Sequence, residues 1–185
     1  MISTNDFHTG ISIELEGKIF IVIEFQHVKP GKGAAFVRSR LKNLHTGATV
    51  DRTFRAGEKV TQAHLDRKEM EYLYRDGEHF YVMDLETYEQ LILSAEQIGE
   101  GVKYLKENDH LNVVMHGEKV VGVEMPVTVN LKITETEPGL KGDTASGATK
   151  AAILETGVTV QVPLFINSGD EVKIDTRTGN YIERV

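Results

Sequence analysis

The residue best placed to do chemistry is Lys32, in the run Lys29-Pro30-Gly31-Lys32-Gly33. Pro30 fixes its own φ angle, and the two glycines permit tight or left-handed backbone. Because apolar, strand-like runs lie on both sides, this segment is predicted to be a stiff hairpin with Lys32 at its tip. Such a tip has little bulk around it and presents one amine to a narrow site. An ordinary glycine-rich turn that happens to contain a lysine fits the loop alone somewhat better.

The segment after this loop is predicted to be a strand with one basic face. Alternation along Phe36–Leu44 places Val37, Ser39 and Leu41 on one side of the strand. The opposite side then carries Arg38, Arg40 and Lys42. Three cations on one face are seldom needed for packing, so they form a basic stripe.

The net charge of −7 is unevenly distributed along the chain. Residues 1–63 carry 9 Lys/Arg and 6 Asp/Glu, residues 64–127 carry 6 and 14, and residues 128–185 carry 6 and 8, giving +3, −8 and −2. The basic segment, residues 1–63, is called the head. A basic head followed by two acidic segments can bind phosphate at one end of the chain while the rest of the chain repels it. A chance surface asymmetry is the alternative.

Other kinds of functional site find little support. The chain has no cysteine, which excludes disulfides, thiolate zinc sites and cysteine nucleophiles. No two of the seven histidines have the i, i+4 spacing of a zincin, and no nucleophile elbow is present. Gly142 and Gly147 have P-loop spacing, but Ala148-Thr149 follows where Lys-Ser/Thr is required. We therefore expect no catalytic residues, no metal and no cofactor.

The strand pattern predicts an all-β protein of three small barrels. Five short strands in residues 1–63 indicate an SH3-like barrel. In residues 64–127, strands surround one short helix that begins with a capping box at Ser94–Gln97, as in an OB-fold. Residues 128–185 repeat the β pattern and are predicted to form a second OB-fold. No signal peptide or membrane-spanning run is recognisable, so a cytoplasmic protein without membrane contact is expected.

A polar loop, predicted between Glu135 and Lys150, is a further candidate for RNA contact. Its amides and hydroxyls, with Lys141, could meet an RNA backbone or bases. An ordinary mobile loop is equally consistent with this composition.

Taken together, these segments resemble the bacterial elongation factor P family over essentially the whole chain. The resemblance rests on an ordered set of segments: Asn5-Asp6-Phe7, Val28 to Arg38, Tyr72-Leu73-Tyr74, Phe80 to Asp84, Glu135 to Thr144, and Lys150 through Gly157 to Ile166. No one segment is decisive, but the ordered set is highly specific. It implies a KOW-like N-terminal domain followed by two OB-folds.

The resemblance also implies a function. A member of this family would bind the ribosome beside the peptidyl-tRNA, between the exit and peptidyl sites, contact both ribosomal RNAs, and relieve stalling at consecutive prolines as a monomer. Lys32 matches the position that points to the peptidyl-transferase centre, and Pro30, Gly31 and Gly33 shape its loop. In this family the residue at that position is often extended by a modifying enzyme, and the lysine here leaves lysyl-type and aminopentanol-type extensions open.

Residues for RNA contact follow from the same resemblance together with the basic stripe. They are Lys29, Arg38, Arg40, Lys42, Arg52 and Arg55 in the head, and Lys141, Gly142, Asp143 and Thr144 in the polar loop. A general RNA-binding module that acts in transcription or RNA folding is the alternative from another class. Dependence of polyproline translation on the protein separates the two.

Overall fold

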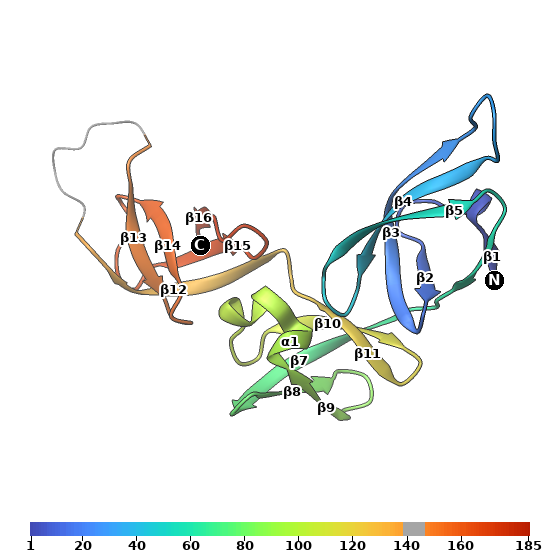
Figure 1. Cartoon of the computed structure of the whole chain (residues 1–185). Helices are drawn as coiled ribbons and strands as arrows, with labels where there is room; N and C mark the ends of the chain where they lie inside the picture. Colours follow the sequence, from blue (N-terminus) through green and yellow to red (C-terminus); the bar gives the residue numbers. More distant parts are fainter. Residues whose placement is uncertain (139–146) are drawn as a thin grey trace. The chain divides into compact units, whose positions relative to one another are not determined.

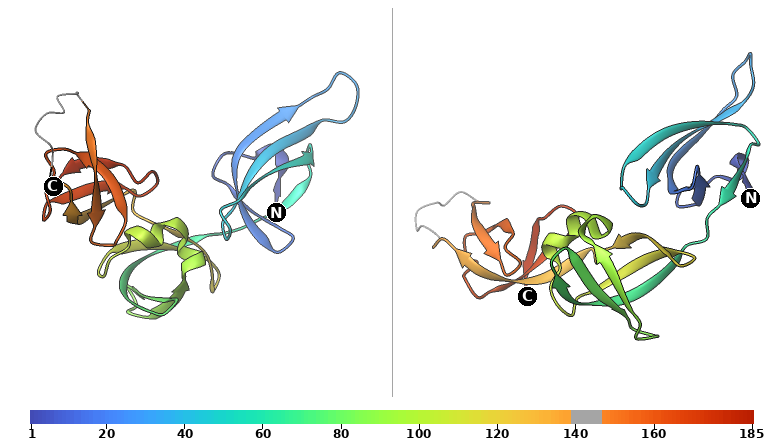
Figure 2. Two further views of the ribbon diagram at one scale, coloured as in Figure 1. Left: turned by 60° about the vertical axis from the view of Figure 1, so that its left-hand side comes forward. Right: turned by 60° about the horizontal axis from the view of Figure 1, so that its bottom comes forward.

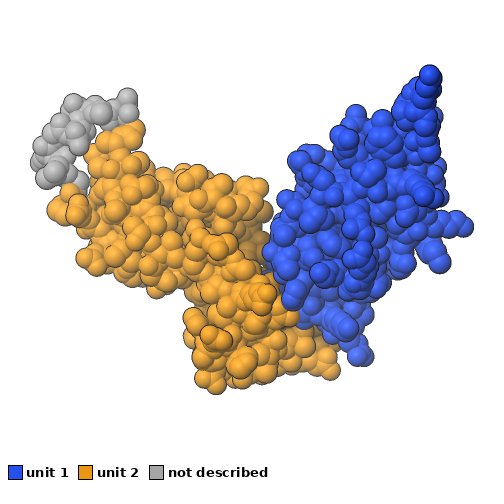
Figure 3. Space-filling model, in the orientation of Figure 1, with its two compact units in different colours: residues 1–68, 113–123 blue, residues 69–112, 124–185 orange. Residues whose placement is uncertain are grey.

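Three antiparallel sheets, each curled into a small barrel, make up almost all of the structure (Figure 1). This computed structural model describes residues 1–138 and 147–185. The chain divides into two compact units, residues 1–68 with 113–123 and residues 69–112 with 124–185 (Figure 3). The predicted all-β class, an SH3-like barrel followed by two OB-folds, is confirmed. Within the described ranges, no helix is long and apolar enough to cross a membrane.

The N-terminal sheet has the strand order β1-β6-β2-β3-β4-β5. Its strands are β1 (Ile2–Ser3), β2 (Ser12–Leu15), β3 (Lys18–Val28), β4 (Phe36–Asn43), β5 (Thr49–Arg55) and β6 (Lys59–Gln62), with a 3-10 turn at Thr4–Asp6. Burial alternates strictly along β4, where Val37 and Leu41 are wholly buried and Arg38 and Arg40 are exposed, as predicted. The inward side chains pack with Phe7 and Phe54, whose rings meet edge to face at 5.5 Å.

The middle sheet has the order β11-β10-β7-β8-β9. Its strands are β7 (Asp66–Asp76), β8 (His79–Asp84), β9 (Gln90–Ser94), β10 (His110–His116) and β11 (Lys119–Glu124). The predicted capping box is present: Ser94 Oγ accepts from the Gln97 amide, and Gln97 Oε1 accepts from the Ser94 amide. The helix α1 (Ala95–Ile98) is short, as predicted, and continues as a 3-10 helix, η2 (Gly99–Tyr104).

The C-terminal sheet has the order β14-β13-β12-β15-β16. Its strands are β12 (Thr128–Thr136), β13 (Thr149–Leu154), β14 (Thr159–Pro163), β15 (Glu171–Asp175) and β16 (Tyr181–Arg184). Both edges of the predicted polar loop belong to strands, because β12 runs to Thr136 and β13 begins at Thr149. Lys150 is buried there, and its ammonium donates to the Glu137 carbonyl at 2.7 Å, which ties the two strand ends together.

Tyr104, at the end of η2, belongs to the core of the C-terminal sheet. It is 3% exposed and packs in the cluster that contains Leu131, Ile133 and Val172. The chain of β15–β16 approaches it so closely that a Cβ at Gly179 would lie 2.7 Å from the Tyr104 hydroxyl oxygen. One aromatic side chain from the segment between β9 and β10 therefore fills the core beneath β12 and β15.

Replacing Tyr104 with alanine is expected to destabilise the protein by about 3–5 kcal/mol, because a large buried aromatic leaves a cavity. Chemical denaturation followed by circular dichroism measures this. Tyr104→Phe keeps the ring and is the matched control, with a smaller loss. Equal stability of the alanine and phenylalanine variants would contradict the packing role of the ring.

Candidate nucleic-acid interface

The β3–β4 hairpin extends beyond the rest of its sheet (Figures 1 and 2). β2 pairs with β3 only over Lys18–Ile21, whereas β4 pairs with β3 out to the pair Val28–Phe36. Between Val22 and Glu24 the register shifts by one residue, a bulge of the kind that bends a strand. β3 beyond this bulge is largely exposed. The bulge therefore marks the point where β3 and β4 extend beyond β2 as an arm, with β5 paired to β4 along the whole length of that arm.

Lys32 lies in the loop at the end of this arm. It is exposed, as are Lys29 and Pro30 before it, and it forms no ion pair or hydrogen bond with the described residues. Gly33 adopts a φ of +111°, and a Cβ added there would lie 3.8 Å from the Pro30 side chain. Space is therefore available at Gly33, but the backbone conformation disfavours any other residue. The loop presents its lysine amine without a competing partner.

The loop end of the arm is braced by two other segments. The Ala56 amide donates to the Ala35 carbonyl at 3.0 Å, which joins the loop end to the turn after β5. The buried Thr4 hydroxyl donates to the Arg55 carbonyl at 2.8 Å, and Glu58 Oε2 accepts from the Arg55 amide at 2.9 Å. These contacts fix the backbone of Arg55 at the same end of the sheet as the loop.

Strand register decides which cations share a face. Arg38 lies opposite Thr53, Arg40 opposite Asp51, and Lys42 opposite Thr49. Arg55, which pairs with Phe36, continues this outward face towards the loop. Four of the predicted RNA-contacting residues are thus brought together: Arg38, Arg40, Lys42 and Arg55.

Arg52 is not part of that face. It lies opposite Ser39, whose side chain is buried with the core residues of β4. Its guanidinium instead forms an ion pair with Glu16 in the turn between β2 and β3, at 2.7 Å. The sequence places Arg52 among the basic residues, but strand alternation separates it from the others.

Arg40 shares its charge with two carboxylates. Its Nε donates to Asp51 at 3.1 Å, and its guanidinium is 3.4 Å from Glu24 on the neighbouring strand. The hydrogen bond and charge of Asp51, with a smaller contribution from Glu24, raise the pKa of Arg40 above its ordinary value. Within the described residues, Arg38, Lys42 and Arg55 have no such carboxylate partner. Of the four cations on this face, these three are therefore free to meet phosphate.

The remaining predicted residues lie elsewhere. Lys29 borders a shallow hollow at the root of the loop, together with Asn5, His27 and Ala56. Lys141, Gly142, Asp143 and Thr144 fall outside the described residues. The bracing residues Thr4 and Glu58 and the paired carboxylates Glu24 and Asp51 were missed by sequence reasoning. Only Asp51 had a signal, because it stands near Arg40 once β4 and β5 form a hairpin.

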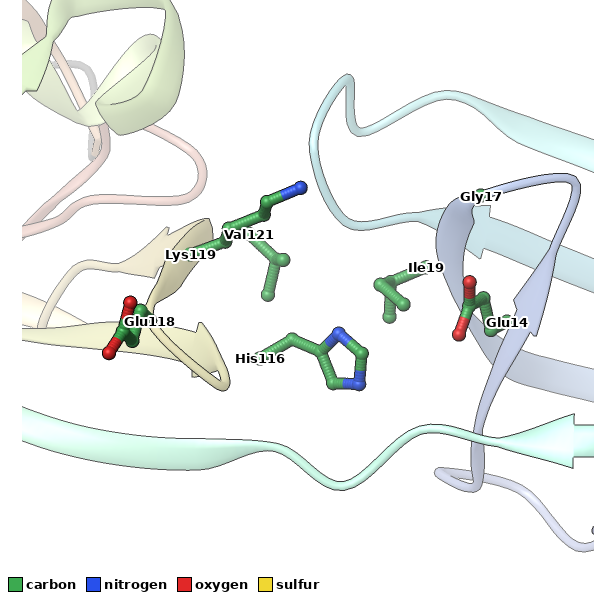
Figure 4. Close-up of a pocket in the computed structure, with 7 residues that line it drawn as sticks. All are labelled: Glu14, Gly17, Ile19, His116, Glu118, Lys119 and Val121. Atoms are coloured by element: carbon green, nitrogen blue, oxygen red, sulfur yellow. The ribbon is translucent and has the colours of Figure 1, made fainter.

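A second hollow of the first unit offers no alternative chemistry. His116 points into it between Ile19 and Val121, while Glu118 points away from the ring (Figure 4). Among the described residues, no group of three His, Asp or Glu side chains could hold a metal ion. The residues that line this hollow therefore form neither a metal site nor a catalytic cluster.

Comparison with known proteins agrees with this architecture. Family models match three consecutive segments: the elongation factor P KOW-like domain at residues 3–60, the elongation factor P OB domain at residues 65–123, and the elongation factor P C-terminal domain at residues 129–184. A solved structure described as eukaryotic translation initiation factor 5A from Methanococcus jannaschii has a similar fold. Its TM-score is 0.54 at 23% identity, over 68% of this chain and 90% of that one.

Relatives over the full length carry the same description. Two proteins named Elongation factor P, from Moorella thermoacetica and Pelotomaculum thermopropionicum, are each 60% identical, with both chains fully covered. A third, from Desulfitobacterium hafniense, is 58% identical over the same extent. The projecting lysine hairpin, the KOW-like and OB barrels in this order and the full-length similarity lead to one conclusion: the chain belongs to the elongation factor P family.

Proposed function

We propose that this translation factor binds the ribosome beside the peptidyl-tRNA and promotes peptide-bond formation at stalled sites such as consecutive prolines. Family membership makes it a translation factor and implies the ribosome as a partner. The observation that carries the finer proposal is the braced arm that ends in one exposed, unpartnered lysine. The arm acts by holding the acceptor end of the tRNA in the peptidyl site.

The length of the arm suits this task. From Val22 to Val28, β3 advances six residues, which is about 20 Å at the rise of an extended strand. The loop that contains Lys32 therefore begins about 20 Å beyond the bulge, at the end of the ribbon formed by β3, β4 and β5. The body of the protein can then contact the outer part of the tRNA while Lys32 reaches the acceptor end.

The mechanism is positional and the factor is not an enzyme. Proline is a poor nucleophile in peptide transfer, partly because its ring restricts the geometry of attack. Holding the acceptor end in place lowers the entropic part of the barrier without supplying an acid or a base. The ribosome performs the reaction, and Lys32 with its loop residues Pro30, Gly31 and Gly33 restrains one reactant.

Phosphate contacts hold the body in register. Arg38, Lys42 and Arg55 are the strongest candidates, because no carboxylate competes for them within the described residues. Lys29 adds a cation at the root of the loop. Arg40 and Arg52 contribute more weakly, since each must share its charge with a neighbouring carboxylate.

The proposal extends to the rest of the chain. Residues 1–63, 64–127 and 128–185 act as three domains of a cytoplasmic monomer that contacts both ribosomal RNAs. Lys141, Gly142, Asp143 and Thr144 make a second RNA contact far along the sequence from the arm. A modifying enzyme extends the Lys32 amine, for which an exposed loop without competing partners is a suitable substrate.

Lys32→Ala is expected to abolish relief of polyproline stalls and to reduce ribosome binding only in part. Because the side chain is exposed and without partners, the free energy of unfolding should change by no more than about 0.5 kcal/mol. A polyproline reporter in a strain that lacks the endogenous factor, with ribosome co-sedimentation, measures both effects. An active Lys32→Ala protein would remove Lys32 from the mechanism.

Lys32→Arg tests modification separately. It keeps the charge but changes the shape and blocks amine-directed extension. If extension of the Lys32 amine is required, this variant should no longer relieve polyproline stalls. Full activity of this variant would contradict only the need for modification, and the role assigned to this position would stand.

The combined variant Arg38→Ala, Lys42→Ala and Arg55→Ala is expected to weaken ribosome binding at every sequence. Each lost phosphate contact should lower the slope of log affinity against log salt by about 1. Arg52→Ala is the matched control, because its side chain lies on the other face beside Glu16, and its slope should change less. An unchanged slope in the triple variant would place the phosphate contacts elsewhere.

A further inference from the structure

Two tyrosines and an isoleucine form an exposed stripe across the middle sheet. Strand register places Tyr74 opposite Tyr81, and Tyr81 opposite Ile92. The two rings are stacked, with centroids 4.5 Å apart and planes inclined by only 16°. Tyr74 remains 44% exposed and Ile92 55% exposed. We call these three residues the aromatic stripe.

The stripe faces outward because of a bulge in β7. The register between β7 and β8 shifts between Tyr72 and Tyr74, so that Leu73 is an extra residue. In a strand without a bulge, Tyr72 and Tyr74 would share a face, since side chains two residues apart lie on the same side of a strand. Tyr72 is 6% exposed, whereas Tyr74 points outward. Bulges that redirect a side chain in this way often serve a function.

The core does not explain these outward residues. It is filled from the opposite face of the same strands, where Met70, Phe80, Val82 and Leu93 are all buried. Burial of Tyr81 and Ile92 is therefore not needed to hold the barrel together. Three large apolar side chains in register, at the surface of one small domain, indicate a surface that another molecule covers.

The charged residues around the aromatic stripe indicate which kind of molecule would bind there. The row on one side pairs Glu71 with Met83, and the row on the other side pairs Asp76 with His79. These three rows contain two carboxylates and no lysine or arginine, and residues 64–127 as a whole carry 14 acidic and 6 basic residues. The neighbouring Arg75 belongs to the inward-facing row, with its guanidinium 5.1 Å from the Phe80 ring centre.

We propose that the aromatic stripe docks a protein segment rich in arginine or lysine. Cations stack on tyrosine faces, and their aliphatic stems can lie against Ile92, while Glu71 and Asp76 attract the positive charge. Phosphate would be repelled by the same carboxylates, so the surface favours protein over RNA. β9, which carries Ile92, is the terminal strand in the order of its sheet, so an extended segment can approach from that side. This surface goes beyond the proposed function, because it requires neither the arm nor RNA.

The test uses the full chain and a fluorescein-labelled decapeptide of alternating arginine and glycine, with binding followed by fluorescence anisotropy. The double variant Tyr74→Ser/Tyr81→Ser should bind about 10-fold more weakly, the loss expected for two exposed cation–π contacts. Tyr88→Asn is the matched control. Tyr88 is an exposed tyrosine (72%) in the loop between β8 and β9, outside the stripe, and its φ of +60° suits asparagine. This control should stay within about 2-fold of the original affinity.

Ile92→Lys keeps both tyrosines and adds a like charge, so it too should weaken peptide binding. Circular dichroism and melting temperature confirm that each variant is folded. Absence of peptide binding by the original chain, or unchanged binding by the double variant, would overturn the proposal. It would also be overturned if the original chain bound a single-stranded decauridylate and the double variant did not, since the stripe would then be an RNA platform.

Discussion

Backbone hydrogen bonding between β3 and β4 beyond Val22 is the constraint on which the N-terminal site depends. Two strands alone are marginally stable in water, so the part of the β3–β4 hairpin beyond β2 needs further support. β5 supplies part of it by pairing with β4 as far as Phe36, and the contacts of Thr4, Glu58 and Ala56 hold the end of β5. Among the described residues, the Lys32 side chain takes part in none of these contacts, so its amine stays available.

The same pairing sorts the charges of the head. Alternation along β4 turns its cations outward, and the partner strands then decide how much of each charge is available. Glu24 and Asp51 flank Arg40 from both sides, whereas Arg38 and Lys42 lie opposite uncharged residues of β5. The cations on this face look equivalent in the sequence. In the structure they differ in how much of their charge is already paired, and Arg38, Lys42 and Arg55 have no carboxylate partner among the described residues.

Within the second unit, the segment between β9 and β10 packs against the C-terminal sheet. Tyr104 comes from the short helical segment after β9, yet its ring lies in the core of the C-terminal sheet. Lys106, two residues later, donates to the Asn130 carbonyl at 3.0 Å. Tyr104, at the end of η2, is therefore held in place by packing against the C-terminal sheet, which follows later in the chain.

Period-two patterning and turn residues in the sequence determined the β class, the loop at Lys32, the basic face of β4 and the capping box at Ser94. These features are local, since each depends on residues within a few positions of one another. Long-range pairing decided the rest: the carboxylates of Arg40, the separation of Arg52, the insertion of Tyr104 and the outward turn of Tyr74. Simple alternation places Tyr72 and Tyr74 on one face, and only the pairing of β7 with β8 accommodates the extra residue that separates them. A bulge is a property of two strands together, so one strand's sequence does not reveal it.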